Sequence, residues 1–267
     1  MYAFEYHRPA TLKQAASLLR KNVNARALSG GQSLIPALKL RLASPPALVD
    51  LGGIEELHGI KLEAAVLSIG AMTRHNEVAA SKDVAIGIPA LARLAADIGD
   101  RQVRNMGTLG GSLANNDPAA DYPAAVLGLG ASVHTNKRKI PADRFFTGLY
   151  ETALKAGEII TRVSFPLPKR AAYVKFRNPA SRYAIAGVFV SEGGGSVRLA
   201  VTGAANCVFR VTEMETKLTE KFAAEAIANV RVPADQLNSD IHAGAEYRSH
   251  LITVIAQRAV ESALAGK

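Results

Sequence analysis

Two short segments of this chain pair adjacent glycines with hydroxyl side chains, a combination that can bind an anion. Glycine allows positive φ and lets the backbone approach a ligand without a Cβ clash. Successive N–H groups in such turns form an anion-binding nest, to which serine and threonine hydroxyls add donors. The first segment consists of Ser29, Gly30, Gly31, Gln32, Ser33 and Leu34, and the second of Thr108, Leu109, Gly110, Gly111 and Ser112. One such segment is often an ordinary tight turn, but two in one chain can clamp a pyrophosphate from opposite sides.

The two segments match neither of the standard nucleotide-binding fingerprints. The chain has no GxxxxGKS or GxxxxGKT sequence. It also has no GxGxxG between a strand and a helix with an acidic residue about twenty positions later. The pattern therefore excludes a P-loop enzyme and argues against a Rossmann dinucleotide domain.

The residues that usually bind metals are few and scattered. Cys207 is the one cysteine, and the six histidines show no HxxxH spacing. An iron–sulfur cluster needs about four cysteine thiolates, so any such cluster must belong to another chain. We expect no metal held by this protein, and no side chain is predicted to act as a catalytic base or nucleophile.

Composition describes an ordinary globular protein. The chain has 267 residues, of which 48 % are hydrophobic and 21 % charged, enough for two or three domain-sized units. No apolar run approaches the roughly 18 residues needed to span a membrane. The opening residues show no secretory signal pattern, so we expect a cytoplasmic protein.

The formal net charge of +9 raises the alternative of a nucleic-acid-binding module. The basic residues are spread along the chain, and with no Trp and 6 % aromatic residues a platform for stacking bases is not evident. We therefore expect no nucleic-acid partner.

The elements around the first segment read as a β-turn-α-β unit. Apolar spacing predicts an amphipathic helix over Thr11–Asn22 with Thr11 as its N-cap. The other predicted elements are a strand at 25–28, a helix over 34–42 and a strand at 47–51. This order places the glycines at the carboxyl end of a strand.

The elements around the second segment are less regular. We predict a strand at 66–73, a short helix over 74–80 capped by Thr73, a helix over 89–99 and a strand at 158–168. Residues 102–125 are dense in Gly, Asn and Asp, so we expect a long functional loop there.

The last hundred residues change character. Three antiparallel strands are predicted at 172–176, 184–192 and 196–209, with a hairpin turn at 193–195. Helices are expected over 219–230 and 246–266. A domain boundary is placed near Pro166–Pro168.

Several segments together resemble one protein family. ALSGGQSLIPALKLRLASPPALVDL, IGAMTRHNEV, IGDRQVRNMGTLGGSLANNDPAADYPAA and GEIITRVSFPLP resemble, in order and spacing, the medium subunits of the xanthine dehydrogenase/carbon monoxide dehydrogenase family of molybdenum hydroxylases. The carboxyl-terminal GAEYRSHLITVIAQRAVESAL resembles the carbon monoxide dehydrogenase branch. The resemblance covers essentially the whole chain.

The resemblance implies an α+β fold. Residues 1–168 would form an FAD-binding domain of the p-cresol methylhydroxylase type, with subdomains at about 1–55 and 56–168. Residues 169–267 would form a second α+β domain of the carbon monoxide dehydrogenase flavoprotein type, with a three-stranded antiparallel sheet and helices.

The resemblance also implies site residues. The two glycine segments would surround the FAD diphosphate, and Asp121, Ile160, Lys175 and Tyr183 match positions that line the cofactor. Each of these four has a structural alternative: Asp121 could cap the following helix, Ile160 could be strand core, Lys175 could be solvated, and Tyr183 could pack between domains.

The implied function is non-covalent FAD binding and electron transfer. A large subunit would carry the molybdenum cofactor, a small subunit the [2Fe–2S] clusters, and the heterotrimer would pair into a dimer. Many relatives have His in place of Gln32 and Asn in place of Ser112, which puts the flavin's redox tuning in doubt. A stand-alone FAD oxidoreductase of the same fold is the alternative.

Overall fold

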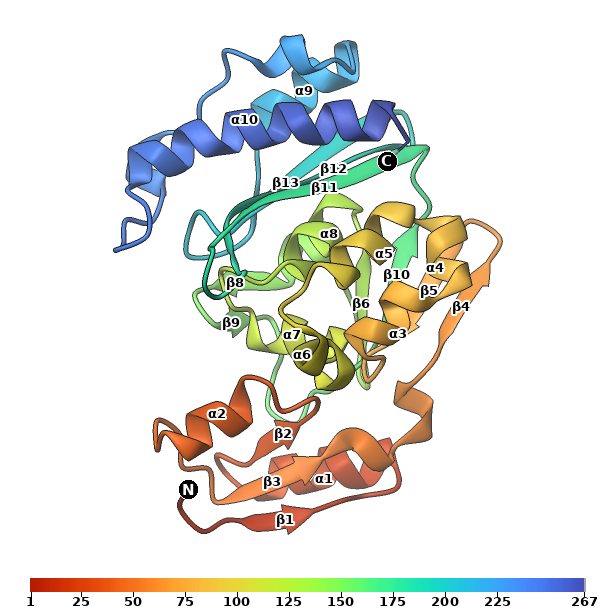
Figure 1. The fold of residues 1–267 in the computed structure, drawn as a ribbon. Helices are drawn as coiled ribbons and strands as arrows, with labels where there is room; N and C mark the ends of the chain where they lie inside the picture. The colour runs from red at the N-terminus through yellow and green to blue at the C-terminus, as the bar shows by residue number, and fades with distance from the viewer. Residues whose placement is uncertain (267) are drawn as a thin grey trace.

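The computed structural model describes residues 1–266, which form three sheet layers stacked along one long axis (Figure 1). A small parallel sheet at the N-terminus lies at one end, a five-stranded sheet with six helices lies in the middle, and a four-stranded sheet covered by the last helix lies at the other end. The two predicted glycine segments therefore belong to adjacent layers.

The N-terminal layer is the predicted β-turn-α-β unit with one additional strand. Its elements are β1 (Glu5–His7), α1 (Leu12–Lys21), β2 (Arg26–Leu28), α2 (Leu34–Lys39) and β3 (Ala47–Asp50). The strands are parallel in the order β1-β3-β2. The Thr11 hydroxyl accepts a hydrogen bond from the Gln14 N–H at 3.3 Å, which confirms the predicted N-cap. Two 3₁₀ turns, η1 (Leu51–Gly53) and η2 (Glu55–Leu57), lead to the middle layer.

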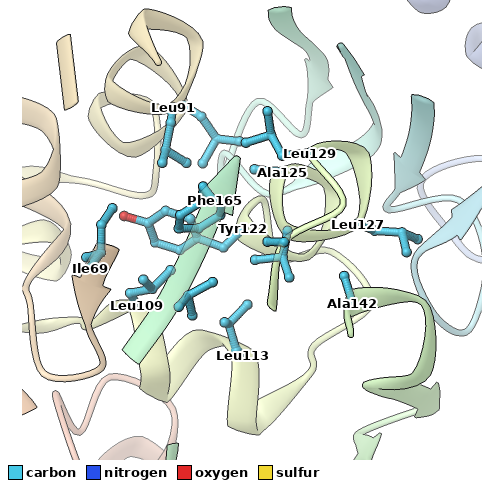
Figure 2. Packing of buried hydrophobic residues seen from close by; sticks show 14 of the residues in the cluster. Ile69, Leu91, Leu109, Leu113, Tyr122, Ala125, Leu127, Leu129, Ala142 and Phe165 are labelled. Atoms are coloured by element: carbon cyan, nitrogen blue, oxygen red, sulfur yellow. The ribbon is translucent and has the colours of Figure 1, made fainter. Parts of the chain in front are cut away.

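The middle layer is an antiparallel sheet in the order β4-β5-β10-β6-β7. Its strands are β4 (Ile60–Glu63), β5 (Val66–Gly70), β6 (Ser132–Thr135), β7 (Lys139–Pro141) and β10 (Ile160–Pro166). Its helices are α3 (His75–Ala80), α4 (Lys82–Gly87), α5 (Pro89–Ala96), α6 (Arg101–Met106), α7 (Leu109–Asn115) and α8 (Tyr122–Gly128). Figure 2 shows the ring of Tyr122, on α8, packed among Leu91, Leu109 and Phe165.

The expectation of a long loop over residues 102–125 is wrong, because this stretch contains α6, α7 and the start of α8. Polar residues in this stretch and just before it cap short helices. The Asp100 carboxylate accepts from the Val103 N–H at 2.7 Å, and the Thr108 hydroxyl accepts from the Gly111 N–H at 3.1 Å. Asn116 then ends α7 in a left-handed conformation.

The expected cap at Thr73 is also wrong. Arg74 is the N-cap residue of α3, and its N–H donates to the Glu77 carboxylate at 2.6 Å. The Thr73 hydroxyl instead donates to the Gly59 carbonyl at 3.1 Å, which ties the start of α3 to the turn before β4.

The C-terminal layer contains four strands rather than the expected three. β11 (Arg170–Arg177), β12 (Ala184–Gly193) and β13 (Ser196–Thr202) are the three predicted strands, and the two-residue β14 (Phe209–Arg210) pairs with β13. The hairpin turn at 193–195 is confirmed, since Gly193 pairs with Ser196.

The helices of this layer follow the prediction only at the C-terminus. α10 (Ala245–Leu264) covers the sheet as expected, whereas the helix expected over 219–230 is wrong: α9 spans Thr212–Glu220, and η4 (Ala224–Ile227) and η5 (Ala234–Gln236) follow it. A short hairpin of β8 (Phe146–Gly148) and β9 (Glu151–Thr152), preceded by η3 (Ala142–Arg144), lies beside the middle layer.

The middle and C-terminal layers share one hydrophobic core. Phe189 on β12 and Ala200 on β13 are fully buried in the same cluster as the residues of α8 and β10. Among residues 1–266, no helix is long and apolar enough to cross a membrane, and no group of three His, Cys, Asp or Glu side chains is arranged to hold a metal.

Candidate cofactor-binding site

The two glycine segments, distant in sequence, touch each other in the fold. The Ser29 and Thr108 hydroxyl oxygens lie 2.7 Å apart, within hydrogen-bond distance. A Cβ added at Gly30 would lie 2.2 Å from the Met106 carbonyl oxygen and 2.7 Å from the Gly107 Cα. Only glycine at position 30 allows this approach, so the sequence itself dictates the contact between the layers.

The first segment, residues 29–34, is the turn between β2 and α2. The N–H groups of Gly30, Gly31, Gln32 and Ser33 donate to no acceptor among residues 1–266. Gly31 has φ +71°, and the Gln32 side chain folds back to donate to the Gly30 carbonyl at 3.2 Å. Consecutive unpaired N–H groups around a glycine of positive φ form an anion-binding nest. The half-buried Leu34 begins α2 and adds an apolar side chain.

The second segment, residues 108–112, begins α7 and uses its N–H groups internally. The Leu109 N–H donates to the Thr73 carbonyl at 3.0 Å, and the Gly110 N–H donates to the Ala71 carbonyl at 2.8 Å. The Gly111 and Ser112 N–H groups donate to the hydroxyl and the carbonyl of Thr108. The segment is therefore anchored to the residues that follow β5.

Two serine hydroxyls beside this contact have no hydrogen-bond partner in the described part of the chain. They are those of Ser33 in the first segment and Ser112 in the second. A partly exposed hydroxyl with no protein partner can donate to a ligand. The combined donor set, four N–H groups and two hydroxyls, fits an anionic group such as a diphosphate.

Asp121 and Lys175 lie together in a buried polar cluster. The Asp121 carboxylate accepts from the Tyr173 hydroxyl at 2.5 Å and from the Lys175 ammonium at 3.1 Å. Lys175 also donates to the Asp97 carbonyl at 2.9 Å. The cluster thus joins β11 to α8 and to the end of α5.

The structural alternatives for these two residues are wrong. Asp121 occupies the N-cap position of α8, but its carboxylate makes no capping hydrogen bond and is committed to β11 instead. The Lys175 side chain is only 1 % exposed, so it is not solvated.

Burial controls the ionisation of this cluster. Burial raises the pKa of the Asp121 carboxyl, and the Lys175 charge opposes that shift. Burial together with the Asp121 charge holds the pKa of the Tyr173 hydroxyl well above its usual value. Tyr173 therefore remains a hydrogen-bond donor to Asp121 at physiological pH.

The remaining two predicted residues differ sharply in exposure. Ile160, at the start of β10, is buried in the hydrophobic core, as its structural alternative predicted. Tyr183, in the connection between β11 and β12, is 51 % exposed, so it is not an interior packing residue. Partial burial and the nearby carboxylates of Asp117 and Asp121 raise the pKa of Tyr183.

No motif in the sequence pointed to His75, which packs against Gly107 just before the second glycine segment. A Cβ at Gly107 would lie 2.6 Å from its Nε2 atom, and its ring lies 5.3 Å from the ring of Tyr122. Burial, together with the charge of Arg104, lowers the pKa of His75 to about 4, so the imidazole is neutral at pH 7. Only the packing of α3 against the Gly107 turn reveals this position.

Comparison with known proteins identifies relatives over the whole chain. The family described as "FAD binding domain in molybdopterin dehydrogenase" matches residues 2–168. The carbon monoxide dehydrogenase medium chain of Hydrogenophaga pseudoflava is 34 % identical, with 98 % of this chain and 97 % of that protein covered. The nicotine 6-hydroxylase medium subunit of Paenarthrobacter nicotinovorans is also 34 % identical, with the same coverage.

Solved structures agree with the sequence relatives. The reconstituted CO dehydrogenase from Oligotropha carboxidovorans contains a chain that superposes with a TM-score of 0.89 at 35 % identity. The match covers 100 % of this chain and 99 % of that one.

Proposed function

Because this chain belongs to the family of FAD-binding medium subunits of molybdenum hydroxylases, an oxidoreductase family, we propose that it is the electron-transfer subunit of such a complex. It would take electrons from a partner iron–sulfur subunit and pass them to an external acceptor. When bound, FAD supplies the redox chemistry, while the protein supplies binding, orientation and electrostatics.

The open donors of the first glycine segment carry the proposal for the cofactor's position. The N–H groups of residues 30–33 and the hydroxyls of Ser33 and Ser112 would bind the diphosphate of a non-covalently held FAD. Because Ser29 and Thr108 are in contact, the diphosphate would lie along the rim of the two segments rather than between those hydroxyls.

The other proposed residues would form the wall on the C-terminal side. Asp121 and Lys175 would form an ion pair in this wall, in which each charge neutralises the other. Ile160 would pack behind the wall in the hydrophobic core. Tyr183 would stack on the flavin ring system, because it is a half-exposed aromatic residue that can offer its ring to a flat ligand.

The proposed partners are a large molybdopterin subunit that oxidises the substrate and a small subunit with [2Fe–2S] clusters, in a dimer of heterotrimers. Support comes from the relatives, which are named medium chains or medium subunits.

We also propose the division at residue 168, with two FAD-binding subdomains of the p-cresol methylhydroxylase type before it. The family match that ends at residue 168 supports this boundary.

The visible absorption spectrum tests the proposal. We expect the chain, purified with its partner subunits and desalted after addition of FAD, to keep flavin bands and to release intact FAD on denaturation. A complex that retains no flavin would refute the cofactor assignment. Reduction of the flavin by a substrate in the isolated chain would refute the electron-relay role in favour of a stand-alone oxidoreductase.

A further inference from the structure

Tyr150 is an exposed aromatic residue held in an unfavourable backbone conformation. It lies at the tip of the β8–β9 hairpin with φ +54°, and 57 % of the residue is exposed. The left-handed region brings the Cβ of any residue other than glycine too close to the following carbonyl oxygen, so this conformation is unfavourable for tyrosine. Because Tyr150 is mostly exposed, core packing does not explain why a large ring occupies this position.

The Tyr150 hydroxyl points to the same carboxylate that influences Tyr183. It donates to the Asp117 carboxylate at 3.4 Å. The charge of Asp117 also contributes to the raised pKa of Tyr183, and Tyr183 contributes to the raised pKa of Tyr150. Figure 1 shows the β8–β9 hairpin on the same side of the molecule as the β11–β12 connection that carries Tyr183.

A buried asparagine fixes the hairpin to the second glycine segment. The Asn116 amide donates to the Gly148 carbonyl at 2.8 Å and to the Glu151 carbonyl at 2.7 Å, one on each side of Tyr150. Asn116 is 1 % exposed and follows α7, the helix whose first turn is the Thr108 segment. The short helix α7 therefore links the position of Tyr150 to the second glycine segment.

The connection that carries Tyr183 is fixed in a similar way. The Asn178 side-chain oxygen accepts from the N–H groups of Ala180 and Ser181 at 2.9 and 3.1 Å, and the Asn178 N–H donates to the Tyr183 carbonyl. Two separately clamped loops on the same side of the molecule thus each carry an exposed tyrosine.

We propose that Tyr150 is a second aromatic contact residue for the flavin ring system, located beside Tyr183 with its hydroxyl held by Asp117. The inference rests on the proposed function and adds a residue to the site that the sequence motifs do not indicate. An aromatic ring held at a fixed position next to a bound ring system adds both contact area and a favourable ring–ring geometry.

The test compares Tyr150→Asn and Tyr150→Phe with the neighbouring Leu149→Asn, in the complex assembled with its partner subunits. Asn tolerates the left-handed conformation, so Tyr150→Asn removes the ring without adding backbone strain. Leu149 is similarly exposed in the same turn and serves as the matched control. The readouts are the dissociation rate of FAD, the fluorescence of the bound flavin and the midpoint of thermal unfolding.

We expect Tyr150→Asn to accelerate FAD dissociation about 3- to 10-fold and to raise flavin fluorescence, the size expected for the loss of one aromatic pair. Tyr150→Phe and Leu149→Asn should stay within about twofold of the wild type. Unchanged FAD dissociation and fluorescence in Tyr150→Asn, with FAD retained by the wild-type complex, would overturn the inference. If the wild-type complex holds no FAD, the proposed function itself fails, so the two failures are distinguishable.

Discussion

The first and second glycine segments have nearly the same residues but use their backbones differently. In the first, the N–H groups of residues 30–33 have no acceptor among residues 1–266. In the second, the N–H groups of residues 109–112 are all bonded to residues 71, 73 and 108. A glycine pair flanked by hydroxyls therefore predicts a permissive backbone, whereas the neighbouring elements determine whether its donors serve a ligand or the fold.

This difference implies that substitutions in the first segment should act mainly on cofactor binding, and substitutions in the second mainly on stability. Gly30 is an exception, because it is where the two segments touch. Substitutions at both segments can be ranked by their expected effect.

The largest effect is expected for Gly30→Ala, which should lower both the stability of the protein and its binding of FAD. Its Cβ would lie 2.2 Å from a backbone carbonyl oxygen, so the two layers must separate. We expect the free energy of unfolding to fall by about 3 kcal/mol, the upper end for overpacking, and FAD to be lost on desalting. Urea unfolding and absorption spectra measure the two effects.

Gly244→Ala is the matched control for that substitution. Gly244 has φ −74°, and the nearest atom to an added Cβ is 4.0 Å away. Its stability should stay within about 0.5 kcal/mol of the wild type. Equal losses in the two variants would show that the contact between the segments is not tight.

The second effect is a pH dependence that arises at His75, beside the second segment. The pKa of His75 is about 4 in the folded protein, against an ordinary value of 6.5, so between these values the unfolded chain binds a proton that the folded chain does not. The contribution of neutral His75 is complete above pH 6.5 and is lost as pH falls toward 4. We expect a loss of about 3 kcal/mol across this window.

The measurement is a series of urea unfolding experiments from pH 7 to pH 4 on the wild type and on His75→Gln. Carboxylates titrate in both proteins, so the difference between the two curves isolates the histidine. A difference that does not change with pH would contradict the assignment of a buried neutral His75.

A third substitution, Gly31→Ala, should separate binding from stability. At φ +71° an alanine costs roughly 1 kcal/mol of stability, and the only close contact, 2.9 Å, is with the flexible side chain of Ile35. Distortion of the nest should remove about one hydrogen bond to a charged group, about 1.4 kcal/mol or tenfold in FAD affinity.

Gly194→Ala provides the comparison for Gly31→Ala. Gly194 has φ +59° with open space around it, so it carries a similar backbone penalty far from the site. FAD titration should show weaker binding for Gly31→Ala alone. Equal FAD affinity in both variants would mean that the first segment does not bind the cofactor.

The smallest effect is expected for Thr108→Val, which removes the cap of α7 and the hydroxyl contact to Ser29. The loss should be about 1 kcal/mol of stability, as for other N-caps, with less change in FAD affinity than Gly31→Ala causes. Thr11→Val removes the equivalent cap of α1 and should leave FAD affinity unchanged. A larger effect of Thr108→Val on FAD affinity than on stability would contradict the division between the two segments.

Local sequence patterns predicted the elements of the N-terminal layer except β1, because strong signals such as Thr11 and the glycine pair mark where they begin or end. They failed over residues 102–125, where Thr108, and Asp100 just before the stretch, act as helix caps rather than as loop formers. The same residue types favour both structures, and the choice depends on burial of the following apolar residues, which local composition does not reveal.

The site was predictable only in part, for the same reason. The glycine segments are visible in the sequence, but the pairing of Asp121 with Lys175 joins residues 54 positions apart on different layers. No local pattern marks His75 or Tyr150, because their positions depend on tertiary contacts. His75 packs against the Gly107 turn, and Tyr150 lies in a hairpin that Asn116 holds in place.

The shared core has a consequence for how this protein could be recombined. The Asp121 carboxylate depends on Lys175 for its counter-charge, and Phe189 fills the core beside Gly128, where an added Cβ would be 2.9 Å from its ring. Cutting the gene after codon 168 would leave a buried carboxylate without its cation and an apolar face open to water. The segment that matches the family model therefore cannot be moved into another protein by itself. A chimera must exchange the middle and C-terminal layers together.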